Sequence, residues 1–277
     1  MNASAQLKMK TRDIEVRGAE DAQAARIYTA GVPGARQDSL IVFFHGGGFV
    51  AGDLEEADDF LRVLVQSNPA QIVLATNYTL ATVRPFPAAV EDAHAVLVWA
   101  RKNKSKLGWT GRQLIVAGIE AGANLAAVCA LMSRDRGGPA LAGQILIMPM
   151  LDPGLSTGSM RTLQSCPDLR EVADACAAAY RGYLPNAADR VHPYASPLQS
   201  SRLKNLPPAL ILCTEDDPLR DEAEQYGARL SSCGVRTTVQ RMMPAPLQEP
   251  GARNECACRS QAIAAMAGFI ATLEPPP

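Results

Sequence analysis

The sequence predicts an α/β fold with a mostly parallel central sheet and helices on both faces. Short runs of β-forming apolar residues alternate along the chain with stretches of helical periodicity, and this alternation is typical of parallel sheets. The composition agrees, because 47% of the 277 residues are hydrophobic and 20% are charged. A chain of this length and composition can build one domain, residues 1–277, around a sizeable core.

Eight segments have the composition of strands. The run at residues 40–44 is apolar at every position and ends at glycines, as expected of a strand covered on both faces. The expected strands are residues 14–17, 25–28, 40–44, 72–77, 114–117, 144–148, 209–213 and 237–241.

Helices are expected between these strands. Val90, Ala93, Leu97 and Ala100 follow one another at helical spacing and would place an apolar stripe against the sheet. The expected helices are residues 55–66, 88–102, 122–132, 171–180, 222–231 and 259–273.

The regular alternation breaks at residues 152–206, where Ser, Pro and Gly surround a single expected helix. We expect this stretch to be a small, reduced cap-like insertion that lies over the sheet. In sheets of this kind, ligands bind beyond the carboxyl ends of the strands. The residues that directly follow each strand are therefore the candidate functional residues.

Charge and cysteine usage exclude several classes of function. The formal net charge of −1 leaves no basic surplus for nucleic acid or for an anionic membrane. The first residues lack the apolar core of a signal peptide, and the apolar runs are too short to span a bilayer. Seven scattered cysteines suggest reduced thiols in the cytoplasm. Cys256 and Cys258 have neither a second pair at zinc spacing nor a following histidine, so we expect no metal and no cofactor.

A run of glycines follows the buried strand at residues 40–44, in the order His45, Gly46, Gly47, Gly48. Successive glycines let the backbone approach a ligand and turn N–H groups into a small cavity, as an oxyanion hole requires. A flexible turn is the alternative reading. The position at the ligand edge of the sheet favours the oxyanion hole.

Together with other motifs, this loop resembles the hormone-sensitive-lipase family of esterases, which has the α/β-hydrolase fold. The matching segments occur in the family's order and are residues 45–49, 77–81, 85–93, 206–209 and 217–222. The resemblance covers roughly residues 40–230. It implies that His45, the three glycines after it and Ala121 form the oxyanion-hole region, and that Asp217 occupies the position of the catalytic acid.

The chain departs from the family at the nucleophile. The family has serine in a Gly-Asp-Ser-Ala-Gly turn from strand to helix. Here the turn reads Gly-Ile-Glu-Ala-Gly over residues 118–122, so Glu120 stands where the serine belongs.

A second departure removes the catalytic base. The family's histidine follows the last strand, but residues 243–250 contain none, and the three histidines of the chain end at His192. A relocated His192 is the alternative that we do not favour. Without the nucleophile and the base that activates it, the family mechanism cannot operate.

Two roles are open to Glu120. It could attack an electrophilic carbon and form a covalent ester, although no histidine would activate water for the second step. It could instead accept hydrogen bonds from Gly47, Gly48 and Ala121 at the amino end of the following helix and plug the oxyanion hole. We favour the plug, and we expect Asp217 to serve as a turn and helix-capping residue.

The sequence therefore predicts a catalytically degenerate, esterase-like protein of the cytoplasm that binds a small ligand or a protein partner. The alternatives are an unconventional carboxylic-ester hydrolase that uses Glu120, and a non-catalytic subunit paired with an active paralogue. The resemblance further implies a homodimer formed through residues 237–241, which would otherwise be an exposed edge strand, or through the helix that follows.

Overall fold

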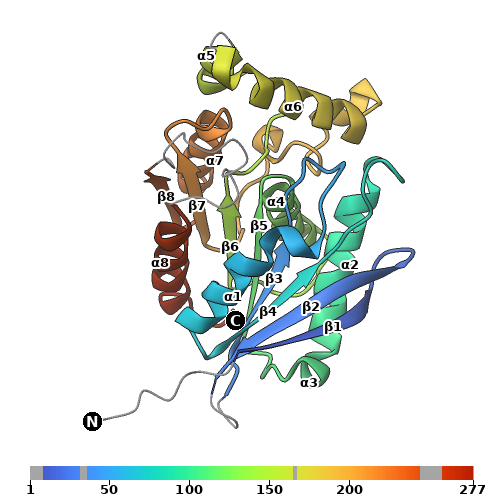
Figure 1. Cartoon of the computed structure of the whole chain (residues 1–277), viewed down its shortest axis with the longest axis vertical. Coiled ribbons are helices and arrows are strands. Elements are labelled where there is room, and N and C mark those ends of the chain that lie inside the picture. The colour runs from blue at the N-terminus through green and yellow to red at the C-terminus, as the bar shows by residue number, and fades with distance from the viewer. Residues whose placement is uncertain (1–8, 32–35, 165–166, 244–257, 277) are drawn as a thin grey trace.

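The computed structural model describes residues 9–31, 36–164, 167–243 and 258–276. Eight strands form one sheet in the order β1-β2-β4-β3-β5-β6-β7-β8 (Figure 1). β2 pairs antiparallel with β1 and β4, and the remaining pairs are parallel. The strands are β1 (Met9–Arg17), β2 (Ala22–Ala30), β3 (Ser39–Phe44), β4 (Gln71–Thr76), β5 (Gln113–Ile119), β6 (Gly143–Ile147), β7 (Ala209–Thr214) and β8 (Thr237–Met242). The predicted fold class is confirmed.

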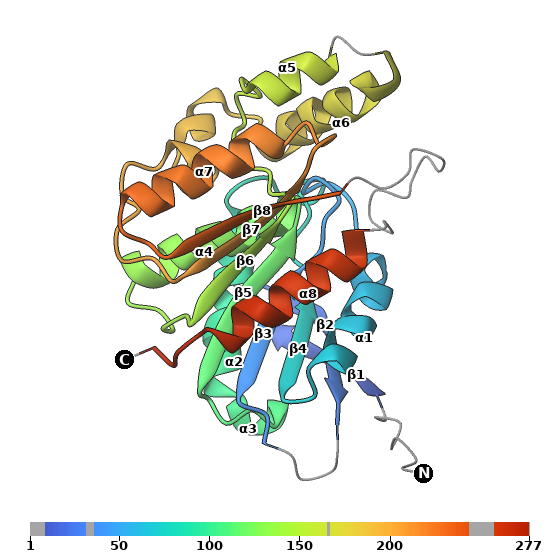
Figure 2. The same cartoon turned by 90° about the vertical axis from the view of Figure 1, so that its left-hand side faces the viewer.

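Helices cover both faces of this sheet and close two separate apolar cores (Figure 2). α2, α4 and α7 pack on one face, and α1 and α8 pack on the other. The α-helices are α1 (Asp58–Ser67), α2 (Ala88–Lys102), α3 (Lys104–Leu107), α4 (Ala121–Asp135), α5 (Gly158–Gln164), α6 (Pro167–Tyr183), α7 (Arg220–Ser232) and α8 (Cys258–Ala271). The short 3-10 helices are η1 (Leu54–Ala57), η2 (Ala187–Val191) and η3 (Pro197–Gln199).

The first two strands are longer than the sequence predicts. β1 and β2 form a hairpin that pairs without a break from Met9 opposite Ala30 to Arg17 opposite Ala22. Most residues of β1 are exposed, because this strand lies at the edge of the sheet. The apolar pattern that reveals inner strands such as β3, buried at every position, is therefore weak here.

The stretch between β6 and β7 carries α5, α6, η2 and η3 and lies over the carboxyl ends of the strands (Figures 1 and 2). The sequence predicted only one helix here, at residues 171–180, and missed α5. α6 packs on the glycine loop: Phe49 stacks on Tyr183 with ring centroids 3.8 Å apart. A Cβ on Gly48 would lie 2.8 Å from that of Ala179, so the contact leaves no room for a side chain at this position.

In the described part of the chain, no helix is long and apolar enough to cross a membrane.

Candidate functional site

A sharp turn connects β5 to α4 and carries Glu120. Its backbone has φ 52° and ψ −112°, a conformation that non-glycine residues rarely adopt. Backbone hydrogen bonds hold the turn: Glu120 N donates to Ile147 O at 2.9 Å, and Glu120 O accepts from Asn124 N at 3.1 Å and Met150 N at 3.2 Å. A Cβ on Gly122 would collide with the Phe44 carbonyl, so only glycine fits at this position. The strained turn typical of a nucleophile elbow is thus present, with a carboxylate in the serine position.

The Glu120 side chain points at the glycine loop. Its Oε2 accepts a hydrogen bond from Gly47 N at 3.3 Å and lies 3.1 Å from where a Cβ on Gly46 would stand. Among the described residues, no hydrogen bond joins this carboxylate to Gly48 or Ala121. Of the three donors expected from the sequence, the structure therefore supplies one. The glutamate is one methylene longer than aspartate, and its head lies against the loop rather than over the first turn of α4.

His45 and Tyr78 support the glycine loop from behind. The His45 Nδ1–H donates to Gly46 O at 2.8 Å, and the ring stacks on Tyr78 with centroids 4.4 Å apart. The Tyr78 hydroxyl donates to the carbonyls of His45 and Gly46 at 3.2 and 3.1 Å. Burial lowers the pKa of His45, so the imidazole is neutral at pH 7. His45 therefore shapes the loop, and Gly47, with φ 91°, directs an N–H group toward the Glu120 carboxylate.

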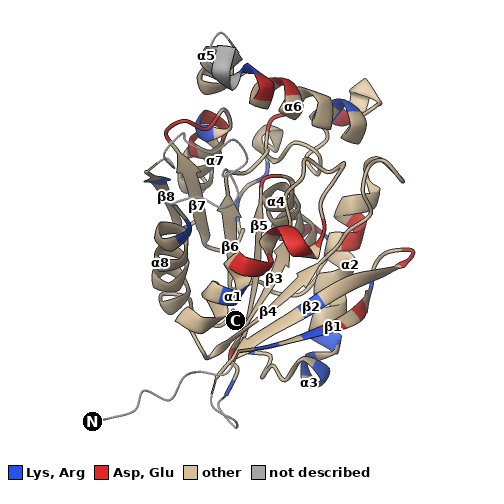
Figure 3. Ribbon diagram, viewed as in Figure 1, with Lys and Arg blue, Asp and Glu red and all other residues tan. Residues whose placement is uncertain are grey.

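The charged surroundings of Glu120 are acidic. Figure 3 shows acidic residues along η1 and the start of α1, beside the carboxyl ends of the central strands. Burial, together with the negative charges of Glu120 and Asp53, raises the pKa of Glu56 on η1. Among the described residues, no Lys, Arg or His forms an ion pair with Glu120. The charged side chains of η1 beside Glu120 are therefore acidic, and none of the described basic side chains neutralises it.

Asp217 lies in the turn between β7 and α7 and is only 2% exposed. Its Oδ1 accepts from Leu219 N at 2.8 Å, and its carbonyl accepts from Arg220 N at 3.1 Å. These contacts fit the turn role expected for Asp217 but not the helix-capping role, because the N-cap of α7 is Leu219 and no side chain caps this helix.

Glu222, on α7, is a buried acid whose burial the sequence reasoning missed. Its Oε2 accepts hydrogen bonds from the N–H groups of Leu151 and Asp152, and burial raises its pKa well above the usual range. Helical spacing could have revealed its position, because Glu222 shares a helix face with buried Tyr226 and Leu230. Glu222 ties the carboxyl end of β6 to α7.

Among the described residues, neither His94 nor His192 forms a hydrogen bond or an ion pair with Glu120 or Asp217. His94 lies on α2, with its Nε2 2.8 Å from where a Cβ on Gly138 would stand. His192 lies in the cap; its ring contacts Phe86 at 5.3 Å, and its Nδ1 accepts from Tyr194 N at 3.1 Å. Residues 244–250, where the family's histidine would fall, lie outside the described residues and contain no histidine.

In the part of the chain that the structure describes, no group of three or more His, Cys, Asp or Glu side chains could hold a metal ion. Cys256, from the dismissed metal motif, lies outside the described residues.

Comparisons with known proteins agree with the fold. The profile of the alpha/beta hydrolase fold family matches residues 41–245. The chain is 34% identical to Esterase LipI of Mycobacterium tuberculosis over 241 residues, which cover 84% of this chain and 72% of the relative. It is 33% identical to an arylesterase of Saccharolobus solfataricus over 236 residues, covering 84% and 74% of the two chains.

A solved structure is similar over nearly the whole chain. The hyperthermophilic esterase of the archaeon Pyrobaculum calidifontis superposes with a TM-score of 0.85 at 36% identity, covering 94% of this chain and 85% of that one. Sequence, topology and site geometry thus agree, and the chain belongs to the hormone-sensitive-lipase type of esterase within the α/β-hydrolase fold family.

Proposed function

We propose that this chain is a pseudo-esterase, a member of the family that binds a ligand or a partner and does not hydrolyse esters by the family mechanism. One observation carries the proposal: the elbow position holds Glu120, whose carboxylate contacts Gly47 N at 3.3 Å. The named relatives are esterases, so the proposal depends on the residues of this chain and not on the family.

The chemistry behind the proposal is the loss of two groups that act as a unit. In serine hydrolases, removal of the nucleophile or of the histidine lowers turnover about a millionfold. Here the elbow has no hydroxyl, and no histidine follows residue 192. An ester carbonyl would also meet a carboxylate where the developing oxyanion needs free N–H donors, and repulsion there opposes the transition state.

The proposed ligand or partner binds where the cap meets the glycine loop. α6 lies against the loop there, and the buried aromatic rings of Phe49, Tyr180 and Tyr183 fill the contact between them. A small molecule without negative charge, or a protein partner, fits this proposal. The cytoplasm as location and the homodimer remain part of it.

The alternative, an ester hydrolase with Glu120 as nucleophile, has no histidine after residue 192 to activate water for the second step. A non-catalytic subunit beside an active paralogue would give the same inactive chain in isolation. Capture of that paralogue from the native cell would favour the subunit.

Hydrolysis of p-nitrophenyl acetate and p-nitrophenyl butyrate tests the proposal. The purified chain, its Glu120→Ala variant and its Glu56→Ala variant should all release p-nitrophenol at the rate of a heat-denatured control. Saturable turnover that survives Glu56→Ala and disappears in Glu120→Ala would refute the proposal and establish a carboxylate nucleophile.

A further inference from the structure

A basic stretch of the chain lies at the end of the sheet opposite Glu120. Residues 101–112 run from the end of α2 through α3 to β5 and contain five Lys or Arg residues, all exposed, and no Asp or Glu. β1 lies beside α3, where Arg12 Nη2 donates to Lys106 O at 2.8 Å (Figure 3). Lys10 and Arg12 are exposed and share one side of β1. We define the basic face as Lys10, Arg12, Arg101, Lys102, Lys104 and Lys106.

The cations of the basic face lack acidic partners. Among the described residues, none of the six forms an ion pair, whereas Arg112, at the end of the same stretch, pairs with Asp38 at 3.8 Å. A Cβ on Gly111 would lie 3.4 Å from Arg101 Nη1 and 3.6 Å from Lys104 Nζ, so two cationic groups approach the same point. An anion that binds beside them relieves their repulsion. The formal net charge of −1 for the whole chain hides this local excess.

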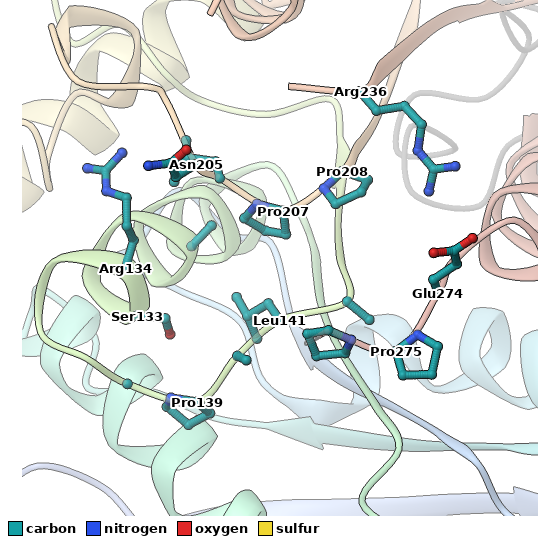
Figure 4. Close-up of a pocket in the computed structure, with 16 residues that line it drawn as sticks. Ser133, Arg134, Pro139, Leu141, Asn205, Pro207, Pro208, Arg236, Glu274 and Pro275 are labelled. Atoms are coloured by element: carbon teal, nitrogen blue, oxygen red, sulfur yellow. The ribbon is translucent and has the colours of Figure 1, made fainter. Parts of the chain in front are cut away.

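A hollow at the same end of the sheet has a different character. It has a volume of about 670 Å³ and is lined by the end of α4 and by the segments before β6, β7 and β8 (Figure 4). Its two arginines lie near acids, because Arg134 pairs with Asp135 at 2.7 Å and Glu274 lies beside Arg236 (Figure 4). The unbalanced positive charge therefore belongs to the basic face and not to this hollow.

β1 also offers backbone groups at the edge of the sheet. It pairs with β2 on one side and, within the described part of the chain, with no strand on the other. At the turn of this hairpin Gly18 N donates to Asp21 O, so the even-numbered residues of β1 direct their backbone groups to β2. Odd-numbered residues such as Thr11, Asp13 and Glu15 direct their N–H and C=O groups outward. These groups form the free edge of β1, where another strand can add.

The two sides of β1 differ in charge. The side that faces α3 carries Lys10 and Arg12. The other side carries Asp13, which is neutralised by Arg26 at 2.6 Å, and Glu15. A strand added to the free edge would therefore be favoured if its side chains were acidic on the α3 side and neutral on the other.

We propose that the basic face and the free edge of β1 bind an extended acidic segment of a partner protein. The segment adds as a further strand: its backbone pairs with the odd-numbered residues of β1, and its acidic side chains, which alternate with neutral ones, lie beside Lys10 and Arg12. A partner protein fits better than a nucleic acid, because the Trp109 ring next to the basic face is 3% exposed and cannot stack on bases. It also fits better than a membrane, because lipid headgroups make no use of the free edge. This surface is separate from the site at Glu120, and the ester assays do not bear on it.

Fluorescence anisotropy with labelled ten-residue peptides at low ionic strength tests this proposal. The first peptide alternates Thr and Glu. The second has the same composition arranged as a block of Thr followed by a block of Glu, and the third alternates Thr and Lys. The intact chain should bind the alternating Thr-Glu peptide most tightly and the block peptide about tenfold more weakly, and it should not bind the Thr-Lys peptide.

Two variants separate the backbone contribution from the charges. Thr11→Pro removes an N–H group that points to the free edge and leaves the pairing with β2 intact, so it should weaken the alternating Thr-Glu peptide about tenfold and the block peptide little. Arg12→Gln combined with Lys106→Gln should weaken both acidic peptides about fivefold. Thermal unfolding should confirm that each variant is folded.

Arg181→Gln combined with Arg190→Gln is the matched control, because it removes an equal charge from exposed residues of the cap, at the other end of the sheet. It should leave all affinities within about twofold of the intact chain. The proposal is overturned if the block peptide binds as tightly as the alternating one, if Thr11→Pro has no effect, if the control acts like the basic-face pair, or if no acidic peptide shows saturable binding up to millimolar concentration. Tighter binding of phosphatidylserine vesicles or of oligothymidylate than of any peptide, unchanged by Thr11→Pro, would also overturn it and assign the basic face to a membrane or a nucleic acid.

Discussion

The strained backbone of Glu120 should reverse the usual ranking of alanine and glycine. At an ordinary position, glycine is about 0.5–1 kcal/mol less stable than alanine, because it gains more freedom on unfolding. At φ 52° and ψ −112°, a residue with a Cβ is strained by about 1–3 kcal/mol, and glycine is not. Both substitutions remove the same hydrogen bond to Gly47, so that loss cancels. Glu120→Gly should therefore be more stable than Glu120→Ala by about 1 kcal/mol.

Urea denaturation of the two variants measures this difference, and thermal unfolding should show a gap of about 2–4 °C. Ala175→Gly on α6 is the control, because Ala175 is exposed in the middle of a regular helix. There the ranking should be ordinary, with glycine less stable by about 1 kcal/mol. If Glu120→Ala proves more stable than Glu120→Gly, the turn is not strained and the elbow geometry described above is wrong.

Four further predictions follow from the site and the sheet. Burial raises the pKa of Glu222, so the folded chain keeps this proton at pH values where the unfolded chain has lost it, and its stability falls as the pH rises through that range. The free energy of unfolding of Glu222→Gln, measured in urea, should therefore exceed that of the intact chain by more at pH 8 than at pH 5. An equal difference at the two pH values would contradict this. Tyr78→Phe removes two buried hydrogen bonds to the glycine loop and should lower the free energy of unfolding by about 1–2 kcal/mol in the same assay, whereas a change near zero would remove Tyr78 as a support of the loop. Glu120→Ser alone should stay near background with p-nitrophenyl butyrate, while the same change with a histidine placed within residues 245–247 should gain activity; a fully active single variant would reveal a hidden base. Light scattering at micromolar concentration should give twice the chain mass of 29.5 kDa, and the mass of one chain would refute the homodimer through β8.

The sequence predicts most of the fold because inner strands are recognisable from their continuous apolar runs. β3 and β4 are buried at every position, so their apolar runs have one interpretation. β1 has one edge without a strand and an exposed pattern, which is why its length was underestimated. α5 is short and lies in the cap, where packing on neighbouring elements decides the conformation more than local propensity does.

The candidate site was predictable in its positions and less so in its contacts. Glycine spacing and the order of the motifs predict that Glu120, Asp217 and the loop after His45 lie at one end of the sheet. The structure has all three at that end. The sequence could not show that the Glu120 carboxylate contacts Gly47 alone among the three expected donors, because this depends on the side-chain rotamer.

Acylation of the elbow tests the central claim most directly. Attack of the Glu120 carboxylate on the ester carbonyl would expel p-nitrophenolate and leave a butyryl-glutamyl anhydride on residue 120. The chain can therefore be incubated with p-nitrophenyl butyrate and treated with hydroxylamine, whose attack on the glutamyl carbonyl releases butyrate and leaves a hydroxamate on Glu120. Intact mass spectrometry with peptide mapping then reports the outcome. The account predicts an unmodified peptide around Glu120, identical to that of the Glu56→Ala variant. A hydroxamate or butyryl group on Glu120, absent when the ester is omitted, would contradict it.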